Sequence, residues 1–461
     1  MAIWDKRHVL KIRDDRNVRF FDLTEENGEP QLVEHDKPKE KMTAVKLRTE
    51  IEPWLTALFQ SEHLSLLTGA GISSAVHELA TGTPGAGMNG SAFSIYNEQI
   101  DSNAKEASER AGRGKPNIED KIRAANSLWE GLRIYTSAEV YGAKRLRKNI
   151  TKLEEDIVNI LTDFTKMILK NESDLIQAKE LAAAAENLMN FLVSFASRSA
   201  TRERLNIFTT NYDRIMEYGA ELAGIRLLDR FVGSIYPIFR ASRLEIDMHY
   251  NPPGIRGEPR YLEGVSHFTK LHGSLDWIYQ DGYVRRVALP FGAESIEDYL
   301  PKQEGGKANT RSLMIYPNSA KDRETSEYPY VELFRDFAAA VCRPNSTLVV
   351  YGYSFGDEHI NRIIKDMLTI PSTHLVIITY SDEGNRVQSF YHEVRRPAQI
   401  SLLIGSHFGH LKRLVEYYLP KPAIDRATFR MAELLKARGV LGPGRQEVKT
   451  PEGGSDESEF D

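Results

Sequence analysis

Hydrophobic residues recur at two different periods along this chain. Short, continuous apolar runs bounded by Gly, Asn or Pro predict buried strands, and longer segments with apolar residues about every 3.6 positions predict helices. Helices are predicted from about residue 49, at 331–342 and at 357–368. The two patterns alternate, which is typical of an α/β fold with a doubly wound, Rossmann-like parallel sheet. The predicted strands are residues 63–67, 205–211, 267–279 (two strands about a turn), 312–317, 346–355, 373–380 and the first part of 400–419.

The strand pattern is absent between about residues 100 and 204. Apolar residues at helical spacing run from Leu153 to Ile168 and again from Leu181 to Phe195. The polar run 171–174 (NESD) separates them and predicts a break with a helix cap. We therefore expect a helical insertion in the α/β domain, with its apolar stripes forming core.

The remaining segments have distinct compositions. Residues 1–48 hold two strand-like pieces, HVLKIRD and VRFFDL, and predict a β appendage. The α/β domain is predicted over 49–420, with a glycine-rich loop at 80–92, and a C-terminal helix over 421–440. Residues 441–461 are rich in Pro and Gly and then acidic, which predicts a disordered tail.

Composition limits the function classes. Of the 461 residues, 41% are hydrophobic and 27% are charged, and the net charge is −5. Direct nucleic-acid binding through a global positive field is not indicated, although a local basic patch stays open. The single cysteine, Cys342, excludes an intramolecular disulfide and a four-cysteine zinc site, and we expect a buried, inert thiol. The N-terminal segment is charged, and no apolar run approaches ~18 residues, so we expect no membrane segment and a cytoplasmic protein.

Glycines and polar residues follow four of the predicted strands. In open α/β sheets, ligands bind beyond the carboxyl ends of the strands, so one crevice can collect all four groups. Taken singly, each group has another explanation: a tight strand-to-helix turn, a helix cap at Asn211 and Asp213, or a turn at His272. The groups are Thr68-Gly69-Ala70-Gly71-Ile72-Ser73, Thr210-Asn211-Tyr212-Asp213, Lys270-Leu271-His272-Gly273 and Gly352-Tyr353-Ser354-Phe355-Gly356-Asp357.

The order of these groups resembles the sirtuin family. The phrases FTTNYDRIME, KLHGSLDW and YGYSFGDEHIN carry the resemblance, which covers roughly residues 50–420 with the helical block as an insertion. The chain is most similar to the sirtuin-like NAD hydrolases of bacterial anti-phage defence systems, those paired with a HerA-like ATPase. The resemblance implies that residues 49–420 form a sirtuin-like, NAD-binding catalytic domain.

The resemblance also implies roles for single residues. Asn211 and His272 fall on the catalytic positions, and Asp213 can hold the site or stabilise positive charge nearby. Histidine can accept a proton near neutral pH, and glycines without a Cβ permit close approach of a pyrophosphate. For Asp357, His359 and Asn361, capping of the following helix stays open beside NAD or subunit contact. The implied cofactor-binding residues are Gly69, Ala70, Gly71, Ser73, Thr210, Gly352, Ser354 and Asp357.

Two departures from the family bear on the reaction. Deacylase sirtuins carry four zinc-binding cysteines, and they follow the first glycine turn with an Asp-Phe-Arg segment; both are missing here. We therefore expect no zinc and water as the acceptor, so that NAD is hydrolysed to nicotinamide and ADP-ribose. By resemblance, NAD depletion serves abortive infection and is controlled by homo-oligomerisation or a HerA-like ATPase. A deacylase, an ADP-ribosyltransferase and a non-catalytic module that binds NAD or ADP-ribose remain alternatives.

Overall fold

The computed structural model describes most of the first 421 residues. The described residues are 4, 7–12, 17–26, 29–37, 41–87, 92–110, 114–137, 143–198, 202–241, 249–250, 260–302, 312–313 and 328–421. Contacts divide the chain into two units, Met1–Pro420 and Lys421–Asp461, and only Lys421 of the second is described. The C-terminal helix predicted at 421–440, the tail predicted at 441–461 and most of the strand predicted at 312–317 therefore lie outside the described residues.

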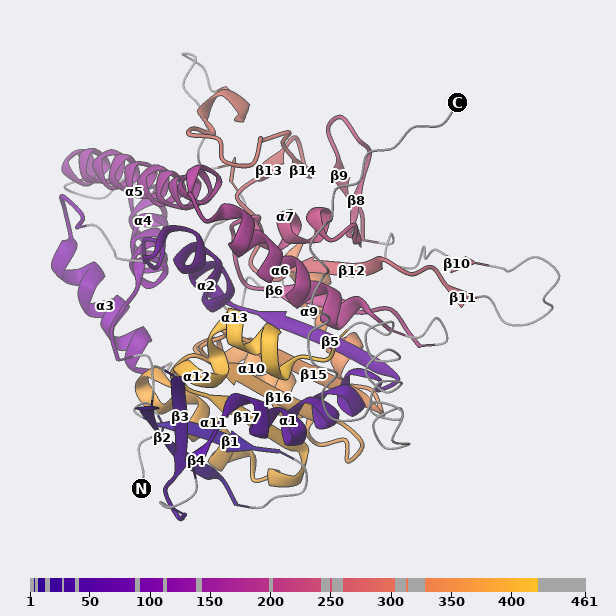
Figure 1. Cartoon of the computed structure of the whole chain (residues 1–461). Helices are drawn as coiled ribbons and strands as arrows, with labels where there is room; N and C mark the ends of the chain where they lie inside the picture. Colours follow the sequence, from indigo (N-terminus) through magenta and orange to yellow (C-terminus); the bar gives the residue numbers. More distant parts are fainter. Residues whose placement is uncertain are drawn as a thin grey trace, which may run out of the picture. The chain divides into compact units, whose positions relative to one another are not determined.

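The first unit is organised around one eleven-stranded sheet in the order β4-β3-β2-β1-β17-β16-β15-β5-β6-β12-β7 (Figure 1). The strands from β17 to β7 are parallel, which confirms the predicted α/β fold. The strands are β1 His8–Lys11, β2 Arg19–Glu26, β3 Glu29–Glu34, β4 Lys41–Met42, β5 His63–Thr68, β6 Asn206–Thr209, β7 Arg226–Leu228, β12 Val265–Lys270, β15 Ser346–Tyr351, β16 His374–Thr379 and β17 Ile400–Ile404.

The N-terminal strands continue this sheet. β1 pairs with β17 in antiparallel register, with Val9 opposite Ile404, and β2 to β4 follow as antiparallel neighbours. The sheet is therefore mixed, whereas the sequence predicted a parallel sheet. Two smaller sheets accompany it. One has the order β13-β14-β9-β8 and the other pairs β10 with β11; their strands are β8 Phe231–Val232, β9 Ile238–Phe239, β10 His249–Tyr250, β11 Arg260–Tyr261, β13 Trp277–Gln280 and β14 Tyr283–Arg286.

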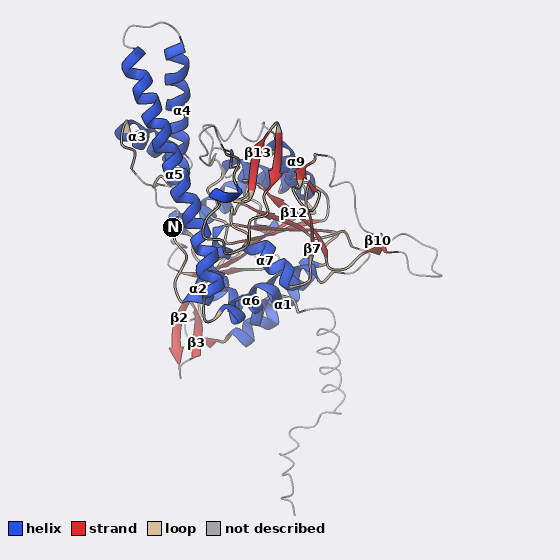
Figure 2. Cartoon of the chain, turned by 90° about the horizontal axis from the view of Figure 1, so that it is seen from above, coloured by secondary structure: helices blue, strands red, loops and turns tan. Residues whose placement is uncertain are grey.

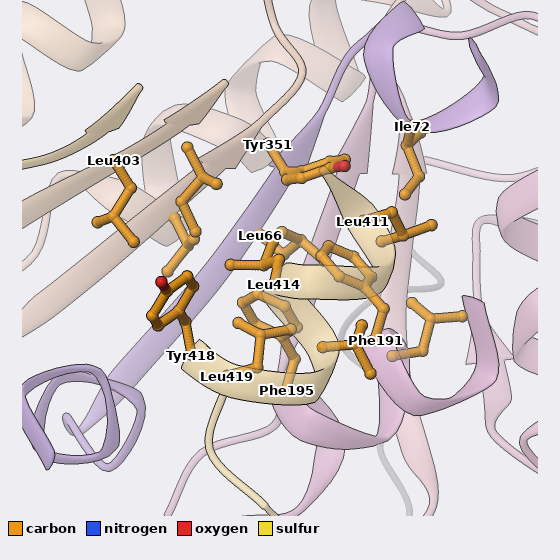
Figure 3. Packing of buried hydrophobic residues seen from close by; sticks show 14 of the residues in the cluster. Leu66, Ile72, Phe191, Phe195, Tyr351, Leu403, Leu411, Leu414, Tyr418 and Leu419 are labelled. Carbon is orange, nitrogen blue, oxygen red and sulfur yellow. The ribbon is translucent and has the colours of Figure 1, made fainter. Parts of the chain in front are cut away.

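Helices cover both faces of the parallel strands because successive strand side chains point to opposite faces. Leu66 of β5 lies in one core cluster with α1, α2, α6 and α7, and the next residue, Leu67, lies in another with α9, α10 and α11. Figure 3 shows the first cluster, in which Tyr351 of β15 packs against Phe191 of α6. The centroids of the two rings lie 5.1 Å apart. These helices are α1 Ala44–Phe59, α2 Ala70–Thr81, α6 Leu181–Ala196, α7 Ile215–Leu222, α9 Tyr330–Val341, α10 Glu358–Met367 and α11 Arg386–Val394.

Shorter elements complete the described part of the chain. After β17 the chain forms α12 Ser406–Gly409, α13 Leu411–Arg413 and a π-helical turn, Leu414–Tyr418. Single 3-10 turns lie at Glu297–Tyr299, Glu383–Asn385 and Pro397–Gln399. Cys342 follows α9 directly and is half-buried, and burial raises the pKa of its thiol. Among the described helices, none is both long and apolar enough to cross a membrane.

The helical insertion contains α3 Asn97–Arg110, α4 Ile118–Ser137 and α5 Ala143–Gln177. Figure 2 shows α4 and α5 side by side, extending away from the sheet. The break predicted at 171–174 is wrong, because the 35-residue helix α5 continues through these positions. Its polar side chains have tertiary partners there: Glu172 is fully buried against Arg214. The helix α6, which the sequence assigned to the insertion, packs in the first core cluster.

Two histidines, the buried His407 and the half-buried His374, should make the protein less stable below neutral pH. Burial lowers the pKa of His407, which contacts the Tyr418 hydroxyl at 2.7 Å, to about 3. Burial also lowers the pKa of His374, 2.8 Å from the Ser401 hydroxyl, to about 4. As the pH falls below the unfolded value of ~6.5, the unfolded chain binds protons that the folded chain does not. The free energy of unfolding should therefore fall between pH 7 and pH 5, by at most about 1.4 kcal/mol per pH unit for each histidine.

Chemical denaturation at pH 7 and pH 5 checks this expectation. His374→Gln removes one of the two titrating groups, so this variant should lose less stability between the two pH values than the wild type. An equal loss in both proteins would show that protonation of His374 does not contribute.

Candidate active site

A cavity of about 230 Å³ lies where β5, β6, β12 and β15 end. It brings together all but one of the predicted catalytic and cofactor-binding residues. Gly71 instead lines a second, adjacent cavity of about 550 Å³, which shares Ala70, Gly352 and Ser354 with the first. The geometry is therefore that of one crevice at the carboxyl edge of a parallel sheet, and the roles of its residues stay predictions. The predicted residues that line the first cavity are Gly69, Ala70, Ser73, Thr210, Asn211, Asp213, His272, Gly352, Ser354 and Asp357.

The two glycines after β5 are packed against the turn after β15. A Cβ on Gly69 would lie 2.6 Å from the Gly352 carbonyl oxygen, and one on Gly71 would lie 2.6 Å from the Gly352 Cα. The Gly71 N–H donates to the same carbonyl at 2.9 Å. Gly352 itself has φ +62°, which favours glycine. The tight strand-to-helix turn that the sequence left open is therefore present. It places the N-terminus of α2 on the cavity wall, where the helix dipole favours an anion.

Asn211, Ser73 and Asp213 form a chain of hydrogen bonds in the cavity. The Asn211 amide donates to the Gly69 carbonyl at 3.0 Å and to the Ser73 hydroxyl at 2.8 Å. The Ser73 hydroxyl donates to one Asp213 oxygen at 2.7 Å, and the other accepts from the N–H of Ile215, the first residue of α7. Asp213 therefore also satisfies a helix N-terminus, whereas the described bonds of the Asn211 side chain stay within the site.

His272 and Asp357 form a second pair. The His272 Nε2 lies 3.0 Å from Asp357 Oδ2, and the other Asp357 oxygen accepts from the His359 N–H as the N-cap of α10. The capping role and the contact with His272 are thus both present. Asn361 holds the loop instead: its amide donates to the Phe355 carbonyl at 2.9 Å.

Comparison with known families was made on the whole chain. Residues 205–396 match the family model of the SIR2-like domain. The match supports a sirtuin-like family. It covers the strand ends that carry Asn211, Asp213, His272 and Asp357, whereas the glycine turn at Gly69 precedes it. A SIR2-like domain implies that NAD is involved. None of the curated proteins compared with the chain matches it.

The helical insertion supplies one wall of the cavity, which the sequence did not indicate. Tyr212 connects the strand ends with the helical insertion. Its hydroxyl donates to Glu119 at 2.9 Å, and its ring packs edge-on against Phe164. The wall residues lie far from the strand-end motifs along the chain, and helical spacing marks three of them, Phe164, Met167 and Ile168, only as core. The wall residues are Asn117, Glu119, Phe164, Met167, Ile168 and Asn171.

Two buried ion pairs fix the segment that carries Asn211 and Asp213. Arg214 pairs with Glu172 of α5 at 2.6 Å. Lys270 pairs with Glu217 at 2.9 Å and also donates to the Asp213 carbonyl. Burial raises the pKa of the Glu217 carboxyl, against the opposing effect of Lys270. Nothing in the sequence connects these positions.

Within the described ranges, no group of three or more His, Cys, Asp or Glu side chains is placed to hold a metal ion. The expectation that no zinc is bound stays a prediction.

Proposed function

We propose that this chain is an NAD glycohydrolase, which cleaves the bond between nicotinamide and ribose and releases nicotinamide and ADP-ribose. The observation that carries the proposal is the single cavity that gathers Asn211, Asp213 and His272 beside the N-terminus of α2. The SIR2-like match over 205–396 supports NAD as the substrate.

The two adjacent cavities suit the two halves of NAD. The smaller one, with Asn211 and His272, would take the nicotinamide riboside, and the larger one would take the adenosine. The start of α2 at Ala70 lines both cavities, so the pyrophosphate would lie at a helix N-terminus, where N–H groups and the dipole stabilise negative charge.

The polar groups of the smaller cavity suit the chemistry. Loss of nicotinamide leaves positive charge on the ribose, and the Asp213 carboxylate can stabilise it. The Asn211 amide can orient a ribose hydroxyl or a water. Because a carboxylate only accepts hydrogen bonds, the contact with Asp357 places a hydrogen on His272 Nε2. Nδ1 is then unprotonated and can take a proton from a ribose hydroxyl.

Two features support water as the acceptor. The chain has one cysteine, so the four-cysteine module that shapes the peptide groove of deacylases has no ligands here. The wall opposite the strand ends carries the apolar side chains of Phe164, Met167 and Ile168 from α5. We propose that this wall leaves no groove for an acyl-lysine.

The biological role is proposed from the resemblance alone. NAD depletion would stop an infected bacterium from supporting phage, so the enzyme must be inactive until infection. We propose control by homo-oligomerisation or by a HerA-like ATPase. The strands β1–β4 and the helices α3–α5 are the candidate interfaces.

Nicotinamide release from NAD tests the function. We expect the full-length protein, alone or with the product of the neighbouring gene, to release nicotinamide, and Asn211→Ala and His272→Ala to abolish release. Deacetylation of a peptide, or ADP-ribose transfer to protein, would favour the deacylase or transferase instead. NAD binding without any nicotinamide release would identify a non-catalytic binding module.

A further inference from the structure

Three carboxylates line the smaller cavity within the described residues: Glu119, Asp213 and Asp357. Two of them have both oxygens engaged. Asp213 accepts from a hydroxyl and from a backbone N–H, and Asp357 contacts His272 and accepts from a backbone N–H. Each of these two carboxylates is held on both oxygens by contacts of 3.2 Å or less, so its first role is to hold its neighbours in place.

Glu119 differs from the other two. Its Oε1 accepts from the Tyr212 hydroxyl at 2.9 Å. Its Oε2 lies 3.5 Å from the Asn117 amide nitrogen, which is longer than the usual N–H···O hydrogen bond of about 2.7–3.2 Å. The side chain is partly exposed and lines the cavity. Oε2 can therefore accept a hydrogen bond from a molecule in the cavity.

Glu119 is also held in a fixed relation to the predicted catalytic residues. Its partner Tyr212 is 6% exposed, and the Tyr212 ring lies 6.4 Å from the His272 ring between centroids. On the other side, the same ring meets Phe164 of α5 at 5.8 Å, nearly edge-on. Tyr212 thus places the insertion's carboxylate beside the strand-end residues.

We infer that Glu119 is a catalytic residue that removes a proton from the attacking water; the inference rests on the proposed hydrolase function. When the bond from ribose C1′ to nicotinamide breaks, its electron pair stays on the ring nitrogen. The water oxygen bonds to C1′, and one water proton passes to Glu119 Oε2 and then to solvent. NAD and water thus give nicotinamide, ADP-ribose and one proton.

Substitution of Glu119 by glutamine, combined with azide, tests this role. Glutamine keeps the size of the side chain but cannot take the proton. In Glu119→Gln we expect kcat for nicotinamide release to fall about 10²- to 10⁴-fold with little change in KM. Azide needs no deprotonation, so sodium azide should restore nicotinamide release and give azido-ADP-ribose. Glu186→Gln, on the exposed face of α6, is the matched control and should keep wild-type activity.

The possible results separate this inference from the proposed function. Wild-type kcat in Glu119→Gln would overturn the inference and leave the hydrolase standing. A loss of activity that azide does not restore would also overturn it, because Glu119 would then only position Tyr212. Wild-type protein that releases no nicotinamide under any condition would overturn the hydrolase and the role of Glu119 together.

Discussion

Replacing Arg214 by methionine should lower the free energy of unfolding by about 3–5 kcal/mol. The Glu172 carboxylate is fully buried, and its negative charge is compensated mainly by the Arg214 guanidinium at 2.6 Å. Arg214 also donates to the carbonyls of Leu289 and Pro290. Methionine fills similar volume but leaves the buried carboxylate and both carbonyls without this donor.

Urea denaturation of the wild type, Arg214→Met, Glu172→Met and the double variant measures the effect. A buried pair replaced on both sides by apolar side chains costs much less than a pair broken on one side. We therefore expect the double variant to regain much of the stability that each single variant loses. Single variants that unfold at the wild-type urea concentration would show that the pair contributes little.

The sheet was largely predictable, because buried parallel strands give continuous apolar runs that are short and are bounded by Gly, Asn or Pro. The order of the strands was not predictable from these runs. Nothing in HVLKIRD indicates that β1 pairs with β17 about 390 residues later. The predicted helix break at 171–174 is wrong for a related reason. Asn and Glu usually mark helix ends when water is their hydrogen-bond partner, but here Glu172 forms an ion pair with Arg214.

The same limit applies to the site. Residues that follow strands share one edge of the sheet by geometry, so the placement of Asn211, His272 and Asp357 could be inferred from the sequence. Glu119 could not be inferred, because its position depends on how the insertion packs against Tyr212. The sequence also does not show that the glycine turn has a packing reason. A Cβ on Gly71 would lie 2.6 Å from the Gly352 Cα, so this position needs glycine even without a ligand.

The pairing of His272 with Asp357 leads to a further prediction about catalysis. Asp357→Asn should lower kcat for nicotinamide release by about 10²- to 10⁴-fold. The carboxylate accepts from His272 Nε2, so Nδ1 is the nitrogen that can take a proton. An asparagine amide can instead donate to Nε2, which would place the hydrogen on Nδ1 and remove the base.

The helix-cap role of Asp357 makes the substitution informative. Asparagine caps helices about as well as aspartate, so its side-chain oxygen should still accept from the His359 N–H, and α10 should be retained. We expect the thermal unfolding temperature and the KM for NAD of Asp357→Asn to stay near the wild-type values while kcat falls. Asp357→Ala, which removes both interactions, should lose stability as well as activity. Equal kcat in Asp357→Asn and wild type would show that Asp357 serves the helix alone, and that His272 does not depend on it for its protonation state.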